Sequence, residues 1–145
     1  MWKLIDDEQI THFKTHGYTA VPNFFTPREV QAMQAEAERF KRDGLGRNVA
    51  TDGDGETHSD TKTNYQVIPL NDKSDLIRAL PFEKRVTDAV SGLIGDPFIL
   101  HLDQLFLKPG GQGIGTNWPQ DNAYFKIAAP LKGTAMWVAI HDATI

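Results

Sequence analysis

Apolar residues recur at helical spacing in three segments of the first two thirds of the chain. This periodicity predicts helices over residues 5–15, 27–42 and 81–94. The second and third segments give the clearest pattern, because each carries at least four apolar residues on one stripe. The N-terminal part of the chain is therefore expected to be helical.

Residues typical of helix ends flank these segments. Gly17 and Gly95 follow the first and third segments, where glycine commonly ends a helix. Thr26 precedes the second segment as a candidate N-cap, with Pro27 at the first helical position and Glu29 three residues after the cap. The pattern and the caps therefore agree on where these helices lie.

The apolar period changes from helical to two after residue 95. Alternation predicts strands over residues 97–111, 123–127 and 134–143, and a shorter one over 64–70. Helices followed by strands predict a mainly β, α+β protein in which antiparallel strands carry a helical flank. We expect one domain over residues 1–145, with a helical layer at 1–95 and the first barrel strands at 96–145.

Residues 43–62 are polar and rich in glycine, which predicts a mobile loop or lid. Asp52, Asp54 and Glu56 within it resemble part of a calcium loop. The terminal glutamate of an EF-hand is missing at the required spacing, so calcium binding is the weaker interpretation.

Composition excludes several classes of protein. The chain has 145 residues, 15 basic and 19 acidic side chains, a formal charge of -4 and no cysteine. Mild acidity argues against nucleic acid as a partner, and no apolar run approaches the roughly 20 residues of a membrane span. Without cysteine, a metal would be held by His, Asp or Glu. A cytoplasmic protein acting on a small molecule is the simplest expectation, and the oligomeric state is not readable.

Gln104 is the most unusual residue of the predicted strand at 97–111, because alternation places it among apolar side chains. A buried amide needs a hydrogen-bonding partner, since leaving it unpaired costs about 1–3 kcal/mol. Either backbone groups satisfy Gln104, or it points into a cavity and binds a polar ligand.

His101 and Asp103 share the other face of the same strand. A His-x-Asp pair on a strand is the local half of a 2-His-1-carboxylate iron site. The pattern is short, and an outward polar face opposite an apolar one is the better interpretation.

Three segments together carry a family resemblance: "DQLFLKPGG" at 103–111, "WPQDNAYF" at 118–125 and "MWVAIHDAT" at 136–144. With the N-terminal stretch 8–40, they resemble the phytanoyl-CoA dioxygenase family of iron(II)- and 2-oxoglutarate-dependent oxygenases. The resemblance implies a double-stranded β-helix, or jelly roll of the cupin type, with an N-terminal helical layer. It also implies Fe(II) and the co-substrate 2-oxoglutarate in the barrel mouth, and hydroxylation of a small organic substrate.

The resemblance assigns roles to individual residues. Asp121 matches the carboxylate of the family's His-x-Asp metal motif, and Pro119 stands where the histidine of that motif is expected. Gln104 matches a position that contacts 2-oxoglutarate, and Gln66 falls near another such contact. Trp137 matches a framework aromatic residue and is expected to pack. In this alignment His101 and Asp103 lie too early to be the metal pair.

Two departures from the family put activity in doubt. Proline offers neither an imidazole nitrogen for a metal nor an N–H for a strand ladder, so Pro119 breaks the metal motif. The family's second histidine and its 2-oxoglutarate-binding arginine would lie beyond residue 145. We therefore expect the N-terminal portion of a jelly roll, incomplete at its C-terminus. A rescue by His141 is conceivable, but a partly buried histidine bonded to a loop is the better interpretation.

Two functions remain open at this stage. The first is an iron dioxygenase lineage, present here as a fragment or as a variant with an impaired metal site. The second is a non-catalytic domain that binds a small ligand in a jelly-roll pocket after losing its metal. Whether this chain is an active enzyme is undecided, because its metal triad is incomplete.

Overall fold

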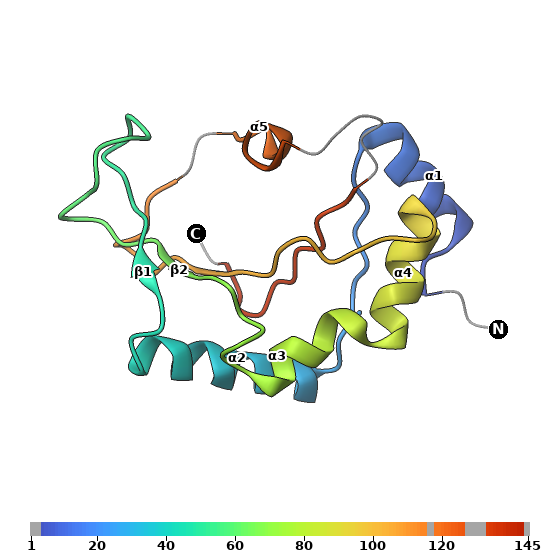
Figure 1. Cartoon of the computed structure of the whole chain (residues 1–145), viewed down its shortest axis with the longest axis horizontal. Coiled ribbons are helices and arrows are strands. Elements are labelled where there is room, and N and C mark those ends of the chain that lie inside the picture. The colour runs from blue at the N-terminus through green and yellow to red at the C-terminus, as the bar shows by residue number, and fades with distance from the viewer. Residues whose placement is uncertain (1–3, 116–117, 127–132, 144–145) are drawn as a thin grey trace. The chain divides into compact units, whose positions relative to one another are not determined.

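The computed structural model describes residues 4–115, 118–126 and 133–143. The described elements are drawn in Figure 1; in chain order they are α1 (Asp7–His16), α2 (Pro27–Arg42), β1 (Arg47–Asn48), β2 (Tyr65–Val67), α3 (Asp75–Ala79), the 3-10 helix η1 (Leu80–Phe82), α4 (Lys84–Ile94), β3 (Leu105–Leu107) and α5 (Asp121–Phe125). The described chain is thus α+β, with helices and one small sheet.

Two compact units make up the chain, and each is described by itself. The helical unit comprises the described residues within Met1–Glu36, Asn71–His101 and Lys132–Ile145. The sheet unit comprises those within Ala37–Leu70 and Leu102–Leu131. The boundary between these groups of residues falls within α2.

The predicted helix ends are confirmed at α1 and α2. Gly17 caps α1 with φ 81°, a left-handed conformation that glycine adopts without a steric penalty. The Thr26 Oγ1 accepts from the Glu29 N–H at 3.3 Å, and the Glu29 carboxylate accepts from the Thr26 N–H at 2.7 Å. This reciprocal capping box satisfies backbone donors that the first turn of a helix leaves unpaired.

The third predicted helix is partly confirmed. The segment 81–94 is α4 from Lys84 onward, but it is preceded by η1 and by α3, which the apolar pattern did not predict. Ser74 caps α3 by accepting from the Ile77 N–H at 3.2 Å. A five-residue helix is too short to show an apolar period, so the N-cap residue Ser74 was the sequence signal for this helix.

A cluster of apolar side chains forms the core of the helical unit. Phe25, Met33 and Val86 are buried together, and Val138 and Ile140 pack against them from the segment 133–143. The Gln34 amide also donates to the Ile140 carbonyl oxygen at 2.5 Å. This segment is therefore held by contacts to helices and not by a strand ladder.

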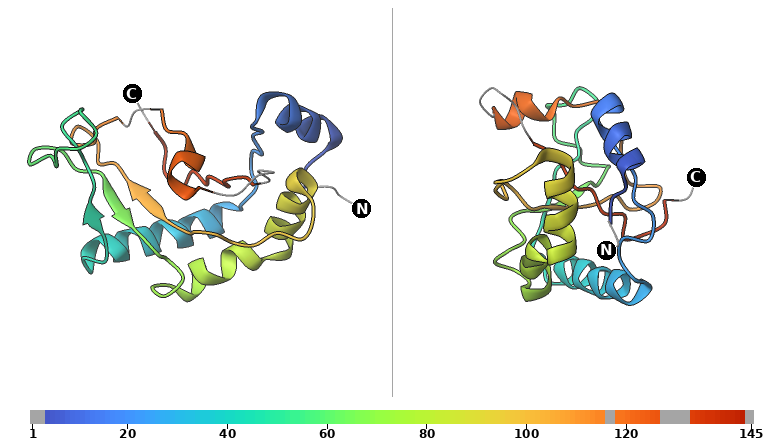
Figure 2. Two further views of the ribbon diagram at one scale, coloured as in Figure 1. Left: turned by 45° about the horizontal axis from the view of Figure 1, so that its top comes forward. Right: turned by 90° about the vertical axis from the view of Figure 1, so that its right-hand side faces the viewer.

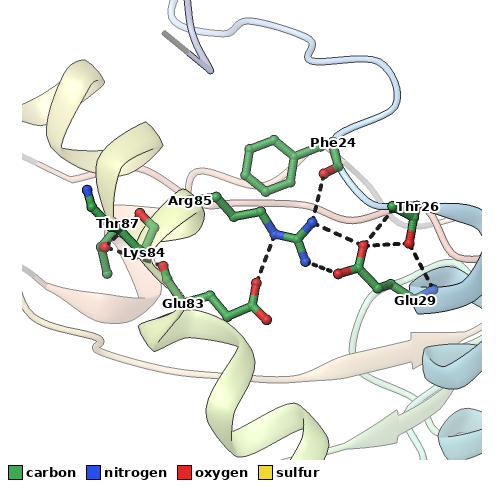
Figure 3. Close-up of polar contacts among 7 residues, drawn as sticks. All are labelled: Phe24, Thr26, Glu29, Glu83, Lys84, Arg85 and Thr87. Carbon is green, nitrogen blue, oxygen red and sulfur yellow. Dashed lines mark hydrogen bonds and ion pairs between the residues drawn. The ribbon is translucent and has the colours of Figure 1, made fainter. Parts of the chain in front are cut away.

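Arg85 joins α4 to the start of α2 within the helical unit (Figure 3). Its guanidinium donates to both carboxylate oxygens of Glu29, and its Nε donates to Glu83 at 2.8 Å. The guanidinium also lies 4.7 Å from the centre of the Phe25 ring. The hydrogen bonds from Arg85 and then from Thr26 lower the pKa of Glu29 to about 2, because they stabilise its charged form.

Three short antiparallel strands form the sheet of the second unit, in the order β1-β2-β3 (Figure 2). The fully buried side chains of Phe40 and Val67 supply its core. Buried Asn64 exchanges two hydrogen bonds with the backbone of Ile114, at 3.0 and 3.2 Å. The segment after β3 is thereby fixed beside β2.

The β content is smaller than the alternating pattern predicted. Within 64–70 the strand is confirmed as β2, and within 97–111 only Leu105–Leu107 forms a ladder. The prediction of a strand over 123–127 is wrong for the described residues, because Ala123 to Phe125 belong to α5. Ile127 lies outside the described residues. Segment 134–143 keeps the predicted alternation without a ladder, since Val138 and Ile140 pack while Trp137 and His141 are exposed.

The polar segment 43–62 contains β1 and an isolated bridge between Thr51 and His58, so it is not loop throughout. Asp54 accepts from the Thr57 hydroxyl at 2.5 Å and from the backbone N–H groups of Glu56 and Thr57. These bonds, the hydroxyl first, lower the pKa of Asp54. The turn thus uses its own carboxylate as an internal cap.

No helix in the described ranges is long and apolar enough to cross a membrane.

Candidate functional site

The register of the sheet gathers polar side chains on one of its faces. Arg47 of β1 pairs with Gln66 of β2, and Gln66 pairs with Phe106 of β3. Gln104 lies two residues before Phe106, so the alternation of an extended chain brings it to the same face. We call Arg47, Gln66, Gln104 and Phe106 the polar sheet face.

Side-chain hydrogen bonds link three of these residues in a row. Arg47 donates to the Gln66 Oε1 from Nη2 at 3.2 Å and from Nε at 3.4 Å. The Gln66 Nε2 then donates to the Gln104 Oε1 at 2.9 Å. Gln66 and Gln104, both predicted from the sequence to contact a co-substrate, are therefore direct neighbours.

Gly46 sets the position of Arg47 by allowing β1 close to Tyr65. A Cβ atom at residue 46 would lie 2.4 Å from the Tyr65 ring and 2.7 Å from the Gln66 carbonyl oxygen. The Gly46 N–H also donates to the Tyr65 hydroxyl at 2.8 Å. Any larger residue at 46 would therefore push the start of β1 away from β2.

Arg47 lies in the segment that was predicted as a loop, so it was not among the predicted site residues. The two-residue strand β1 is too short for an alternating pattern. The available signal was weak: a glycine followed by a charged and a polar residue, which is compatible with a strand start.

Gln104 does not occupy the buried environment predicted for it. It is exposed, as is Phe106, whereas Asp103, Leu105 and Leu107 on the other face are partly buried. The amide is paired by Gln66 rather than by backbone groups or a closed cavity. The prediction failed because β3 has apolar residues on both of its faces, so the alternation did not show which face is buried. The buried face is the one with Leu105, which is the cross-strand partner of the buried Val67 of β2.

Asp103 points inward, so its interpretation as part of an outward polar face is wrong. Its Oδ1 accepts from the Leu70 N–H at 3.1 Å. Its Oδ2 is buried and has no hydrogen-bonding partner. His101 is exposed and belongs to the helical unit, so the two residues do not share one compact unit.

Asp121 lies at the first position of α5 and is exposed, as is Pro119 two residues earlier. The described ranges contain no group of three His, Cys, Asp or Glu side chains that could hold a metal ion. These residues offer one carboxylate where the family's metal motif is expected and do not supply a ligand set for Fe(II).

Several aromatic residues of the segments that carry the family resemblance are exposed. Trp118 and Trp137 are 101% and 84% exposed, and Tyr124 is 74% exposed. The prediction that Trp137 packs is therefore wrong, as is that of a partly buried His141. Trp137 and His141 share one side of the extended segment, as the alternation predicted. The other side, with Val138 and Ile140, packs against the core of the helical unit.

The arrangement favours ligands with oxygen acceptors. The polar sheet face combines a guanidinium, which only donates hydrogen bonds, with two neutral amides and the exposed ring of Phe106. Such a surface can bind a carboxylate or a keto oxygen through directed N–H groups.

The chain is similar to proteins that are named as dioxygenases. It is 26% identical to an ectoine dioxygenase of Stutzerimonas stutzeri over 79% of the chain and 37% of the relative. An ectoine dioxygenase of Nocardia farcinica is 25% identical over 83% of the chain and 40% of the relative. A probable alpha-ketoglutarate-dependent hypophosphite dioxygenase of Stutzerimonas stutzeri is 26% identical over 81% and 42%.

The chain spans about two fifths of the length of these relatives. No solved structure matches it. The family model for phytanoyl-CoA dioxygenase matches residues 13–145, which is nearly the whole sequence. The chain belongs to the phytanoyl-CoA dioxygenase family.

Proposed function

We propose that this chain contributes to an Fe(II)- and 2-oxoglutarate-dependent dioxygenase that hydroxylates a small organic substrate, on a jelly-roll fold. Membership of the family and similarity to relatives named as dioxygenases support this activity. The activity, the small substrate and a cytoplasmic location are inferences for the whole protein, since the chain spans about two fifths of these relatives.

The hydrogen bond between Gln66 and Gln104 is the observation that carries the proposal. These residues are 38 positions apart in the sequence, and their amide groups lie 2.9 Å apart on the polar sheet face. In our proposal this pair binds 2-oxoglutarate, whose two carboxylates and keto group are hydrogen-bond acceptors. The pair orients the co-substrate by directed donors, as polar groups do in ligand sites.

Asp121 is the proposed carboxylate ligand of Fe(II), which when bound would supply the oxidising chemistry with oxygen. Pro119 cannot coordinate a metal, and the described residues provide no three-ligand group. Part of the ligand set is therefore missing from the described chain. The role that follows for its own residues is to bind and orient the co-substrate.

The second candidate is a ligand-binding domain that has lost its metal. Pro119 at the histidine position favours this function, while the polar sheet face is retained. In this case the chain binds 2-oxoglutarate or a similar carboxylate, and Fe(II) does not change its affinity.

An anaerobic titration with Fe(II) and 2-oxoglutarate distinguishes the two functions. The readout is the weak visible charge-transfer band of a ternary complex, measured for the chain as given and for Pro119→His completed with the C-terminal half of a family member. A band in Pro119→His alone would support a dioxygenase with a damaged ligand. Binding of 2-oxoglutarate without a band in either protein would support the metal-free domain, and no binding would contradict both.

A further inference from the structure

We propose that Arg47 is a positioning residue that fixes the direction of the amide pair, so that Gln104 presents its N–H groups to the ligand. This inference rests on the proposed function, because it assigns an orientation to the 2-oxoglutarate contact. Arg47 is outside the residues that the family resemblance assigned, and its role follows from the chemistry of three neighbouring side chains.

A guanidinium can only donate hydrogen bonds, so its neighbour must turn an acceptor toward it. Both Arg47 contacts reach the Gln66 Oε1, at 3.2 and 3.4 Å. With its oxygen held by Arg47, Gln66 has only its NH₂ group left for Gln104. Gln104 must then turn its own oxygen toward Gln66, as the 2.9 Å bond shows.

Arg47 therefore determines which way the Gln66 amide points, and Gln66 in turn determines which way the Gln104 amide points. The Gln104 oxygen is occupied, and its Nε2 with two N–H bonds is left on the far side from Gln66. An amide pair without the guanidinium could form the same bond in either direction, because each group is both donor and acceptor. Arg47 removes that ambiguity, and a chain of hydrogen bonds polarises its members in one sense.

The fold keeps the three side chains at these positions. Arg47 and Gln66 are cross-strand partners, and Gln104 directly precedes β3, which pairs with β2. The lack of a side chain at Gly46 lets β1 approach Tyr65, which places Arg47 within reach of Gln66. Because all three belong to the sheet unit, one compact body holds the array.

This orientation selects the chemical class of the ligand. An outward Gln104 NH₂ group binds carboxylate or keto oxygens and does not bind a ligand that presents only donors. This preference fits 2-oxoglutarate, whose carboxylates and keto group are acceptors.

The first test measures 2-oxoglutarate affinity by calorimetry in matched arginine variants. Arg47→Gln can donate or accept and so loses the directing effect; we expect roughly 3- to 10-fold weaker binding, the loss of one hydrogen bond. Arg47→Lys keeps a donor-only group and should restore affinity to within about threefold of the original. Arg42→Gln, an exposed arginine of the same unit, removes the same charge and should leave affinity unchanged.

The same substitutions in a Gln104→Ala background show whether Arg47 acts through Gln104. If it does, Arg47→Gln changes the remaining affinity by less than about twofold, because the group that it orients is gone. An undiminished loss in that background would mean that Arg47 contacts the ligand directly, and would overturn the positioning role.

Side-chain amide NMR reports the orientation without any ligand. The Nε2 proton that Gln66 donates to Gln104 should have a downfield shift in the original chain and in Arg47→Lys, and should lose it in Arg47→Gln. An unchanged Gln66 signal in Arg47→Gln would overturn the inference. If the signals behave as expected but the original chain does not bind 2-oxoglutarate, the orientation stands and the proposed function fails.

Discussion

Two arginines, one in each unit, show how the same side chain can serve stability or recognition. Arg85 donates to the carboxylates of Glu29 and Glu83 (Figure 3). Its guanidinium also lies over the Phe25 ring. Arg47 donates to the neutral amide of Gln66, and no ion pair joins it to a carboxylate of the described chain. One charge is neutralised within the fold, and the other is not.

The difference indicates where a ligand can bind. A guanidinium that is already paired with carboxylates gains little from an added anion, because the two compete for the same donors. A guanidinium that faces amides keeps its charge available and fixes the direction in which those amides point. The helical unit therefore uses its arginine as a structural link, and we infer that the sheet unit uses its arginine to orient the amides that bind a ligand.

The largest expected effect is on the stability of the sheet unit's core, which Arg47 does not stabilise. Phe40→Ala removes a fully buried ring and should lower the free energy of unfolding by about 3–5 kcal/mol. Urea denaturation measures the loss. A cost below about 1 kcal/mol would mean that Phe40 is not central to this core.

Gly46→Ala tests whether close strand approach is needed for the polar sheet face. The new Cβ would overlap the Tyr65 ring, so we expect a loss of about 1–3 kcal/mol in stability, together with weaker 2-oxoglutarate binding. Gly92→Ala in α4 is the control, because nothing lies within 4 Å of its Cβ position and alanine favours a helix. Equal behaviour of the two variants in thermal melts and in binding would contradict the role of Gly46.

Identical substitutions at the two arginines compare their roles directly. Arg85→Met should lower stability by about 1–2 kcal/mol from its contact with Phe25 alone, with a further loss from its hydrogen bonds. Arg47→Met, at an exposed position, should change stability by less than about 0.5 kcal/mol. Chemical denaturation of both variants is the measurement, and a larger loss at Arg47 would reverse the comparison.

Glu29 should make the stability of the helical unit depend on pH. The pKa of Glu29 is lowered from 4.5 to about 2 in the folded chain, so the unfolded chain binds its proton first as pH falls. Its contribution is fully present above about pH 4.5 and is lost as the pH falls to about 2. Glu29→Gln should flatten this part of the stability profile, seen by circular dichroism at several pH values.

In the same pH window the amides of the polar sheet face do not titrate. The Glu29→Gln substitution should therefore leave the sheet unit's affinity for 2-oxoglutarate unchanged at neutral pH. A matching change in affinity would show that Glu29 influences the polar sheet face.

Helices and their caps could be predicted from the sequence because their signals are local. The Thr26–Glu29 box and the Gly17 cap each depend on residues a few positions apart. Strand extents could not be predicted equally well, because a ladder depends on partners distant in sequence. Residues 123–125 form a helix although they lie in a segment that was predicted as a strand.

The candidate site was predictable only in part for the same reason. The resemblance selected Gln66 and Gln104, and the structure places them side by side. Arg47 was missed because its importance comes from cross-strand register, which no local pattern encodes. The metal role of Asp121 stays a prediction, since the described residues supply no ligand set around it.

The central claim is that the polar sheet face binds 2-oxoglutarate through Gln104. The most direct measurement is a titration of 2-oxoglutarate into the chain while the side-chain amide signals of its glutamines are followed by NMR. We expect the Gln66 and Gln104 signals to shift with one common dissociation constant, and exposed Gln31 on α2 to stay unchanged. Saturating 2-oxoglutarate that moves neither Gln66 nor Gln104 would contradict the account.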